Sequence, residues 1–249
     1  MGFWLAKFIF LGPLLRLVYR PWIEGRENIP TDRPAILASN HLAFVDSFFL
    51  PLLAPRKITF LAKAEYFYTP GIKGRFQRMF FAGVGQVPID RDDKDAARAA
   101  LTTGVRVLHE GKLLGIYPEG TRSPDGRLYR GKTGVARMAL ESGAVVIPCA
   151  MINTEVIQPP GRRLPKLRPR AGVRIGKPLD FSRYEGMAGD RFVERSMTDE
   201  IMYELMQLSG QEYVDQYAAK VKQGEDDPAP ADAREVRELG DRVPGTKAS

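Results

Sequence analysis

The hydrophobic positions of the chain follow two patterns, which predict strands and helices in alternation. Short apolar runs bounded by turn residues predict strands over residues 22–28, 34–40, 57–63, 85–90, 112–118 and 144–152. Apolar positions at helical spacing predict helices over residues 41–54, 93–110, 133–143 and 191–222. Because the two kinds of element alternate, we expect an α/β fold with a mostly parallel, mixed sheet flanked by helices.

The N-terminal segment differs from the rest because large apolar side chains dominate it. A single helix across a bilayer needs about 20 mostly apolar residues, and here the Gly12-Pro13 pair interrupts the run. We therefore predict that residues 1–21 form helical pieces that anchor the chain in the membrane interface. A spanning helix and a secretory signal are the alternatives.

Two further segments follow from composition. Residues 22–222 are long enough to form one catalytic domain with a substantial core. Residues 223–249 are rich in charge, proline, alanine and glycine and have too few large apolar side chains to build a core. We therefore predict that this last segment is a disordered tail.

The formal net charge of +7 favours anionic partners such as nucleic acid, phosphorylated substrates or acidic lipid headgroups. Beside an apolar N-terminal segment, this charge predicts an anionic membrane surface as the partner, and we expect no nucleic acid. One cysteine and two histidines are too few ligands for a structural zinc site. We predict neither a bound metal nor a resident cofactor.

Polar residues follow three of the predicted strands, at the carboxyl ends where the active sites of parallel α/β sheets gather. These polar corners are Asn40-His41, Asp90-Arg91 and Glu119-Gly120-Thr121-Arg122. The guanidinium groups of the two arginines suit a phosphate, which they bind through charge-assisted, bidentate hydrogen bonds. Ordinary ion pairs at strand ends are the alternative interpretation.

His41 and Asp46 form a candidate catalytic pair at the start of an apolar helix. On a continuous helix, a spacing of five residues turns the two side chains roughly 140° apart. A contact therefore requires His41 in the turn before the helix and Asp46 inside it, and Ser39 and Asn40 are suitable cap residues for such a start. A carboxylate in that position fixes the imidazole tautomer. An unrelated, solvent-facing aspartate is the alternative.

Four blocks of the sequence, in order, carry a resemblance to a known family. They are residues 40–46 (NHLAFVD), 87–91 (VPIDR), 117–123 (YPEGTRS) and 146–150 (VIPCA). The sequence resembles the 1-acyl-glycerol-3-phosphate acyltransferases and their glycerolipid relatives over about residues 22–178. The first block contains the HX4D motif, and Tyr117 stands where phenylalanine is commoner.

The resemblance implies direct acyl transfer, with His41 as general base and Asp46 as its orienting partner. The donor is acyl-CoA or acyl carrier protein, and the acceptor is the free hydroxyl of 1-acyl-glycerol 3-phosphate, which gives phosphatidic acid in phospholipid biosynthesis. Glycerol 3-phosphate or another lysolipid is the alternative acceptor. An acyl-serine is not needed, and the GxSxG motif of covalent hydrolases is absent from the sequence.

The resemblance also implies roles for the other polar residues. We expect backbone N–H groups at the helix start after His41 to stabilise the oxyanion. Four basic residues are expected to bind the acceptor phosphate: Arg91, Arg122, Lys63 and Lys132. Four more residues are expected to shape the pocket: Asn40, Glu119, Gly120 and Thr121. The enzyme would work as a peripheral or monotopic protein at the cytoplasmic face of a membrane.

Two other classes of function compete with this interpretation. Residues 126–133 fit the pattern of a phosphate-binding loop, which would indicate a nucleotide hydrolase or a kinase, but they do not directly follow a predicted strand. Residues 161–177 contain many basic residues and no acidic residue, as in a nucleic-acid or membrane binder. This basic stretch lacks aromatic residues for base stacking, so we interpret it as a site for anionic headgroups. A solvated loop and edge strand without a specific partner is the alternative.

Overall fold

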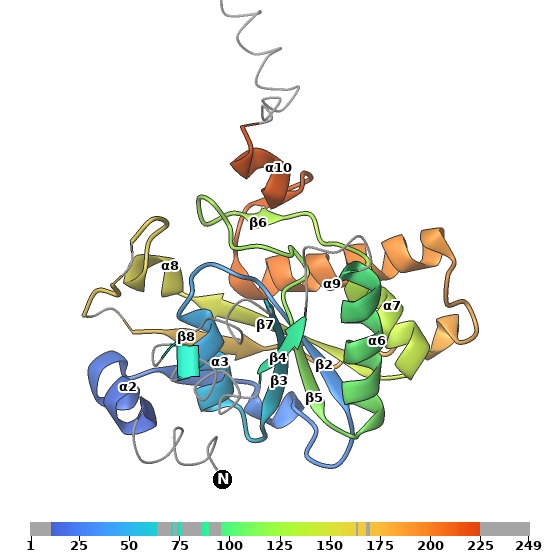
Figure 1. The fold of residues 1–249 in the computed structure, drawn as a ribbon, viewed down its shortest axis with the longest axis horizontal. Coiled ribbons are helices and arrows are strands. Elements are labelled where there is room, and N and C mark those ends of the chain that lie inside the picture. Colours follow the sequence, from blue (N-terminus) through green and yellow to red (C-terminus); the bar gives the residue numbers. More distant parts are fainter. Residues whose placement is uncertain are drawn as a thin grey trace, which may run out of the picture.

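The computed structural model describes residues 11–63, 71, 74–75, 86–89, 96–162, 164–167 and 170–224. These residues form a seven-stranded sheet in the order β1-β8-β7-β2-β5-β3-β4 (Figure 1). The strands are β1 (Trp22–Glu24), β2 (Ala35–Ser39), β3 (Ile58–Lys63), β4 (Gln86–Ile89), β5 (Leu113–Ile116), β7 (Val145–Ile152) and β8 (Gly172–Ile175). Neighbouring strands run parallel except β7 and β8, so the expected mostly parallel, mixed sheet is confirmed.

Helices cover both faces of this sheet. The helices of the described residues are α2 (Leu11–Tyr19), α3 (Asp46–Leu53), α6 (Ala96–His109), α7 (Gly134–Ser142), α8 (Thr154–Ile157), α9 (Arg191–Ser209) and α10 (Ala218–Lys222), and the last of these packs with β6 and β9 and not on the main sheet. Figure 1 shows α6, α7 and α9 on the opposite side of the sheet from α2 and α3. The expected flanking helices are therefore present.

The central strand β2 explains how one sheet carries two cores. Its side chains alternate between the faces, so Leu37 packs with Phe49 of α3 while Ile36 packs with Val135 of α7 and Met197 of α9. All five residues of β2 are buried, as expected for a central parallel strand with both faces covered. Asn40 and His41 therefore follow directly from a strand that is buried on both faces.

The N-terminal helix α2 lies against the α3 side of the domain. The described part of this helix includes Gly12 and Pro13. Tyr19 is buried and meets the ring of Phe49 edge-on, with 5.5 Å between ring centroids. Within the described residues, no helix combines the length and the apolar character needed to cross a bilayer. Residues 1–10 lie outside the described residues, so the anchor stays a prediction.

Three predicted boundaries were wrong for local reasons. The helix expected from residue 41 begins at Asp46, because the residues before it form the turn that Asp46 holds. The strand expected over residues 22–28 ends at Glu24, because Gly25 adopts a φ of 70° and a 3-10 turn follows over Arg26–Asn28. The helix expected over residues 191–222 ends at Ser209, because Gly210 adopts a left-handed conformation at its C-cap.

The chain beyond this helix returns to the edge of the main domain. There β9 (Tyr213–Val214) pairs in parallel with β6 (Leu128–Tyr129), and α10 follows. Residues 225–249, most of the predicted tail, lie outside the described residues.

Candidate active site

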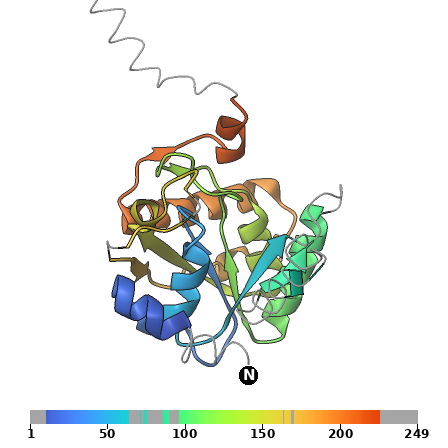
Figure 2. The same cartoon turned by 60° about the vertical axis from the view of Figure 1, so that its left-hand side comes forward.

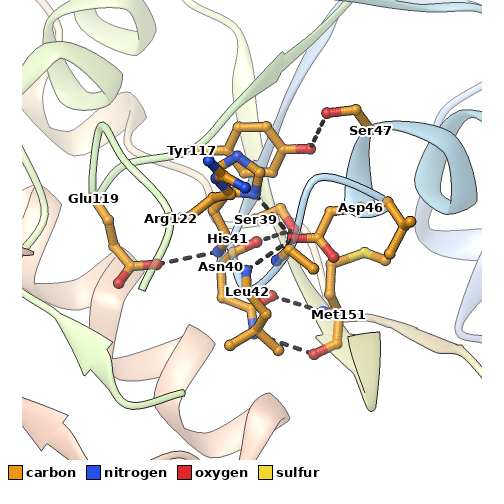
Figure 3. A network of polar contacts seen from close by, with 12 residues as sticks. Ser39, Asn40, His41, Leu42, Asp46, Ser47, Tyr117, Glu119, Arg122 and Met151 are labelled. Atoms are coloured by element: carbon orange, nitrogen blue, oxygen red, sulfur yellow. Dashed lines mark hydrogen bonds and ion pairs between the residues drawn. The ribbon is translucent and has the colours of Figure 1, made fainter. Parts of the chain in front are cut away.

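His41 and Asp46 meet at the carboxyl end of β2. His41 lies in the turn after the strand, Asp46 is the first residue of α3, and the distance from His41 Nδ1 to Asp46 Oδ2 is 2.9 Å (Figure 3). Asp46 is fully buried, and its Oδ2 also accepts hydrogen bonds from the backbone N–H groups of Leu42 and Ala43, each at 2.8 Å. One carboxylate oxygen therefore fixes both the turn and the imidazole, in the arrangement that the five-residue spacing requires.

The contact with Asp46 determines what the imidazole can do. Because a carboxylate oxygen only accepts hydrogen bonds, Nδ1 of His41 carries the proton in this contact. In the neutral ring, Nε2 then keeps its lone pair and can take a proton from a substrate. The side chain of His41 is 15% exposed, so the ring is held within the protein and still borders solvent.

The helix after His41 begins in a different way from the one expected. Neither Ser39 nor Asn40 caps α3, since the N-cap position is Val45 and it has no side-chain cap. Asn40 instead bonds across the sheet to the backbone of Met151: its Oδ1 accepts from the N–H at 2.7 Å and its Nδ2 donates to the carbonyl at 3.2 Å. Asn40 therefore joins β2 to β7.

The expected oxyanion donors are also occupied. The N–H groups of Leu42 and Ala43 donate to Asp46, and the N–H of Val45 donates to Oε1 of Gln158 at 3.2 Å. The expectation that the backbone just after His41 stabilises an oxyanion is therefore wrong for these three groups. Their hydrogen bonds stabilise the turn instead.

Tyr117 supports the imidazole from one face, a contact that the sequence does not reveal. Its ring stacks on that of His41, with 3.8 Å between centroids and 10° between planes. The ring of Phe60 in turn stacks on that of Tyr117, with 5.5 Å between centroids. The hydroxyl of Tyr117 lies 3.4 Å from Oγ of Ser47. Burial raises the pKa of Tyr117, so the phenol stays neutral. The departure from phenylalanine at this position adds a contact to α3.

Glu119 connects the corner after β5 to the corner after β2. Its side chain is 1% exposed, its Oε1 accepts from the N–H of His41 at 3.1 Å, and its Oε2 accepts from the N–H of Tyr129 at 2.9 Å. Burial raises the pKa of Glu119 to about 7, against the two backbone donors. The N–H of Ser123 completes the connection by donating to the carbonyl of His41 at 2.7 Å. Glu119 therefore acts here as a support for the backbone of His41.

The basic residues gather around the chain that follows Glu119. Gly120 has a φ of 74°, and a Cβ there would lie 3.0 Å from Cε of Lys132, so the lysine side chain runs along the glycine. Arg122 is exposed and lies at the His41 corner (Figure 3). Lys222 of α10 donates to Oγ1 of Thr121 at 2.9 Å and to the carbonyl of Arg122.

Lys222 is a site residue that the sequence does not indicate, because it lies 101 residues from Thr121. Its chain reaches the corner through β9, which pairs with β6 (Figure 1). Burial lowers the pKa of Lys222, and the nearby charge of Arg122 lowers it further. This corner therefore concentrates positive charge on a small area.

The structure brings together most of the predicted site residues at one edge of the sheet. These residues are Asn40, His41, Asp46, Glu119, Gly120, Thr121, Arg122 and Lys132. Lys63 is the last residue of β3, and nothing is described of its side chain. Arg91 lies outside the described residues. The roles of all these residues in catalysis or binding stay predictions.

The competing phosphate-loop interpretation does not fit the structure. Residues 128–129 are strand β6, and Tyr129 is fully buried. The N–H groups that would form an anion cradle are bonded within the fold: Leu128 to Glu212, Tyr129 to Glu119, Arg130 to Val214 and Lys132 to Pro118. A phosphate-binding loop needs free backbone donors, so this segment cannot act as one.

Comparisons to known proteins identify the family of this chain and support its fold. The acyltransferase family model matches residues 20–152, more than half of the chain, which includes the His41 corner and Glu119. The chain belongs to this acyltransferase family.

Two named relatives show which acyltransferases this chain is similar to. The chain is 32% identical to the chloroplastic 1-acyl-sn-glycerol-3-phosphate acyltransferase LPAT1 of Arabidopsis thaliana, over 69% of this chain and 47% of that protein. It is 30% identical to the 1-acyl-sn-glycerol-3-phosphate acyltransferase of Borreliella burgdorferi, over 53% of this chain and 51% of that protein. The chain thus spans about half the length of these curated relatives.

A solved structure supports the fold. The 1-acyl-sn-glycerophosphate acyltransferase PlsC from Thermotoga maritima superposes with a TM-score of 0.56 and 24% sequence identity, over 80% of this chain and 79% of that one. At this level of identity the likeness concerns the fold.

Proposed function

We propose that this chain transfers a fatty acyl group from a thioester donor to the free hydroxyl of 1-acyl-glycerol 3-phosphate, which produces phosphatidic acid. The contact between His41 Nδ1 and Asp46 Oδ2 at 2.9 Å carries the proposal, because it leaves Nε2 as a base. The names of the relatives from Arabidopsis thaliana and Borreliella burgdorferi support this acceptor.

The proposed step is a direct displacement. His41 Nε2 takes the proton of the acceptor hydroxyl while the hydroxyl oxygen attacks the thioester carbonyl. The carbon–sulfur bond then breaks, and the imidazolium returns the proton to the leaving thiolate. Asp46 stabilises the positive charge on the ring during this exchange. The donor, acyl-CoA or acyl carrier protein, supplies the reactive carbonyl, so the proposed step uses no resident cofactor.

The acceptor phosphate is proposed to bind at the cationic corner. Arg122 and Lys132 lie beside the loop that Glu119 connects to His41. Arg91 and Lys63 complete the predicted phosphate site. A phosphate held there brings the free hydroxyl of the acceptor toward the dyad, since this hydroxyl and the phosphate are separated by only a few bonds. We place the enzyme at the cytoplasmic face of a membrane, where a lipid acceptor is found.

A transfer assay with a panel of acceptors tests this function. We expect acylation of 1-acyl-glycerol 3-phosphate to be the fastest, with phosphatidic acid as the product in mass spectrometry. Faster acylation of glycerol 3-phosphate, or of a lysophospholipid with a substituted phosphate, would contradict the assignment of 1-acyl-glycerol 3-phosphate as the acceptor. Each donor is tested in parallel, so that acyl-CoA and acyl carrier protein are compared with the same acceptor.

A further inference from the structure

A loop between α8 and β8 presents apolar side chains to solvent. Leu164 and Leu167 in this loop are 75% and 76% exposed. The sequence of residues 161–170 is GRRLPKLRPR, in which five basic residues and no acidic residue surround the two leucines. Exposed leucines among cations suit a surface that offers both acyl chains and negative headgroups. We call the described residues of this stretch, 161–162, 164–167 and 170, the basic loop.

Two hydrogen bonds hold described residues of the basic loop in place. The N–H of Lys166 donates to the carbonyl of Ile157 at 2.7 Å, and Nε of Arg162 donates to the carbonyl of Leu164 at 3.0 Å. The first bond ties Lys166 to the end of α8, and the second joins the side chain of Arg162 to the backbone of Leu164. The two exposed leucines therefore lie on either side of a residue that is fixed to α8.

The basic loop shares a face with the N-terminal helix α2. Nε of Arg170 donates to the carbonyl of Arg20 at 3.1 Å, directly after α2. On α2, Leu14 and Leu17 are 56% and 76% exposed. Figures 1 and 2 both show α2 and the chain between α8 and β8 on the same side of the domain. Two separate segments thus contribute exposed leucines to one face.

Gln158 connects the basic loop to the turn that carries the dyad. Its Oε1 accepts from the N–H of Val45 at 3.2 Å, and its Nε2 donates to the carbonyl of Arg162 at 3.3 Å. Val45 stands directly before Asp46. A surface bound by the basic loop therefore lies next to the candidate active site.

We propose that the basic loop docks on an anionic bilayer together with α2, with Leu164 and Leu167 inserted at the level of the headgroups. The cations of the loop attract the negative surface over a range of about 10 Å at ~0.1 M salt, and the leucines add attachment that salt does not screen. This inference concerns attachment and does not rest on the acyl transfer proposed above.

A fluorescent probe at position 167 tests the docking directly. Cys149 is the only cysteine of the chain and is fully buried, so a polarity-sensitive maleimide will label the Leu167→Cys variant at the new position. The matched control is Phe192→Cys, at a position 88% exposed near the start of α9, on the opposite face of the sheet. Vesicles of phosphatidylcholine, alone or mixed with phosphatidylglycerol, are added to each labelled full-length protein.

The proposal gives a distinct outcome for each sample. With phosphatidylglycerol present, the probe in the Leu167→Cys variant shifts to shorter emission wavelength and is protected from iodide, while the probe in the Phe192→Cys variant does not change. An unprotected probe in the Leu167→Cys variant overturns the proposal, even if the protein sediments with the vesicles through another segment. An equal response to phosphatidylcholine alone overturns the anionic preference.

A charge variant tests the same surface without a label. Lys166→Gln should lower the partition of the full-length chain onto anionic vesicles about fivefold, the factor expected for one basic residue near such a surface. Lys112→Gln is the control, because Lys112 is exposed and precedes β5, at the amino end of the parallel strands. Equal partition of the two variants would remove Lys166 from the docking surface.

Discussion

The two corners that meet at the carboxyl edge of the sheet are built in different ways. The corner at His41 is held by buried groups: Asp46 accepts three hydrogen bonds on one oxygen, and Asn40 bonds to β7. The corner at Arg122 is exposed, and its described contacts include the side chain of Lys222 from the C-terminal segment.

This difference matches two chemical demands. Proton transfer needs donor and acceptor in a fixed geometry, so the base must be held by a rigid network. The attraction between a phosphate and a positive charge falls slowly with distance, so phosphate binding tolerates small displacements of the charged group. We therefore expect changes at the His41 corner to lower kcat, and changes at the Arg122 corner to raise the KM for the acceptor.

The largest expected effect is that of His41→Ala. Without the general base, kcat should fall by at least about a hundredfold, with no loss of fold as measured by circular dichroism and thermal melting. His109→Ala is the matched control, because the second histidine of the chain is exposed at the end of α6 and should keep full activity. Retention of wild-type activity in His41→Ala would contradict the proposed mechanism.

The next prediction concerns the pH dependence of stability that Glu119, which connects the two corners, confers. The folded-state pKa of Glu119, about 7, lies above its ordinary value of 4.5, so between these pH values the folded chain keeps a proton that the unfolded chain has lost. The free energy of unfolding therefore falls as the pH rises through this window, by on the order of a few kcal/mol. The Glu119→Gln variant has no titrating group at this position, so its free energy of unfolding should not show this decrease with pH.

Urea unfolding of wild type and Glu119→Gln at a series of pH values measures this difference. All other titrating groups are common to both chains, so their contributions cancel in the comparison. Glu141→Gln, at an exposed position of α7, should keep the pH dependence of the wild type. A parallel pH dependence in wild type and Glu119→Gln would show that the carboxyl of Glu119 does not titrate in this window.

Arg122→Ala should raise the KM for 1-acyl-glycerol 3-phosphate about tenfold and leave the KM for the acyl donor unchanged. The reason is that a guanidinium supplies a permanent positive charge beside the phosphate, which alanine cannot replace. Arg106→Ala, at an exposed position of α6, is the control for loss of one positive charge. If the two variants have the same acceptor KM, the phosphate binds elsewhere.

The smallest effect is expected for Lys222→Met. This change removes the bonds to Thr121 and Arg122 and one positive charge, so the acceptor KM should rise roughly threefold while kcat stays close to the wild-type value. Lys220→Met, on the same helix, is compared with it in steady-state kinetics. A fall in kcat without a change in KM would place Lys222 with the His41 corner and break the contrast between the two corners.

The sequence determined those features that depend on neighbours along the chain. Alternating apolar runs indicated the strands, because a buried strand needs apolar side chains on both faces, and β2, β3, β5 and β7 agree with their predicted ranges to within one or two residues. The spacing of His41 and Asp46 likewise required a turn before the helix, since a helix would separate the two side chains.

The tertiary structure alone decided which distant groups meet at the site. Asn40 bonds to Met151, 111 residues away, and Lys222 reaches Thr121 across 101 residues. Tyr117 stacks on His41 because β5 lies beside β2 in the sheet. Local periodicity does not encode the order of strands, because that order results from how the whole chain buries its apolar surface. The partners of these side chains were therefore fixed only when the sheet was assembled.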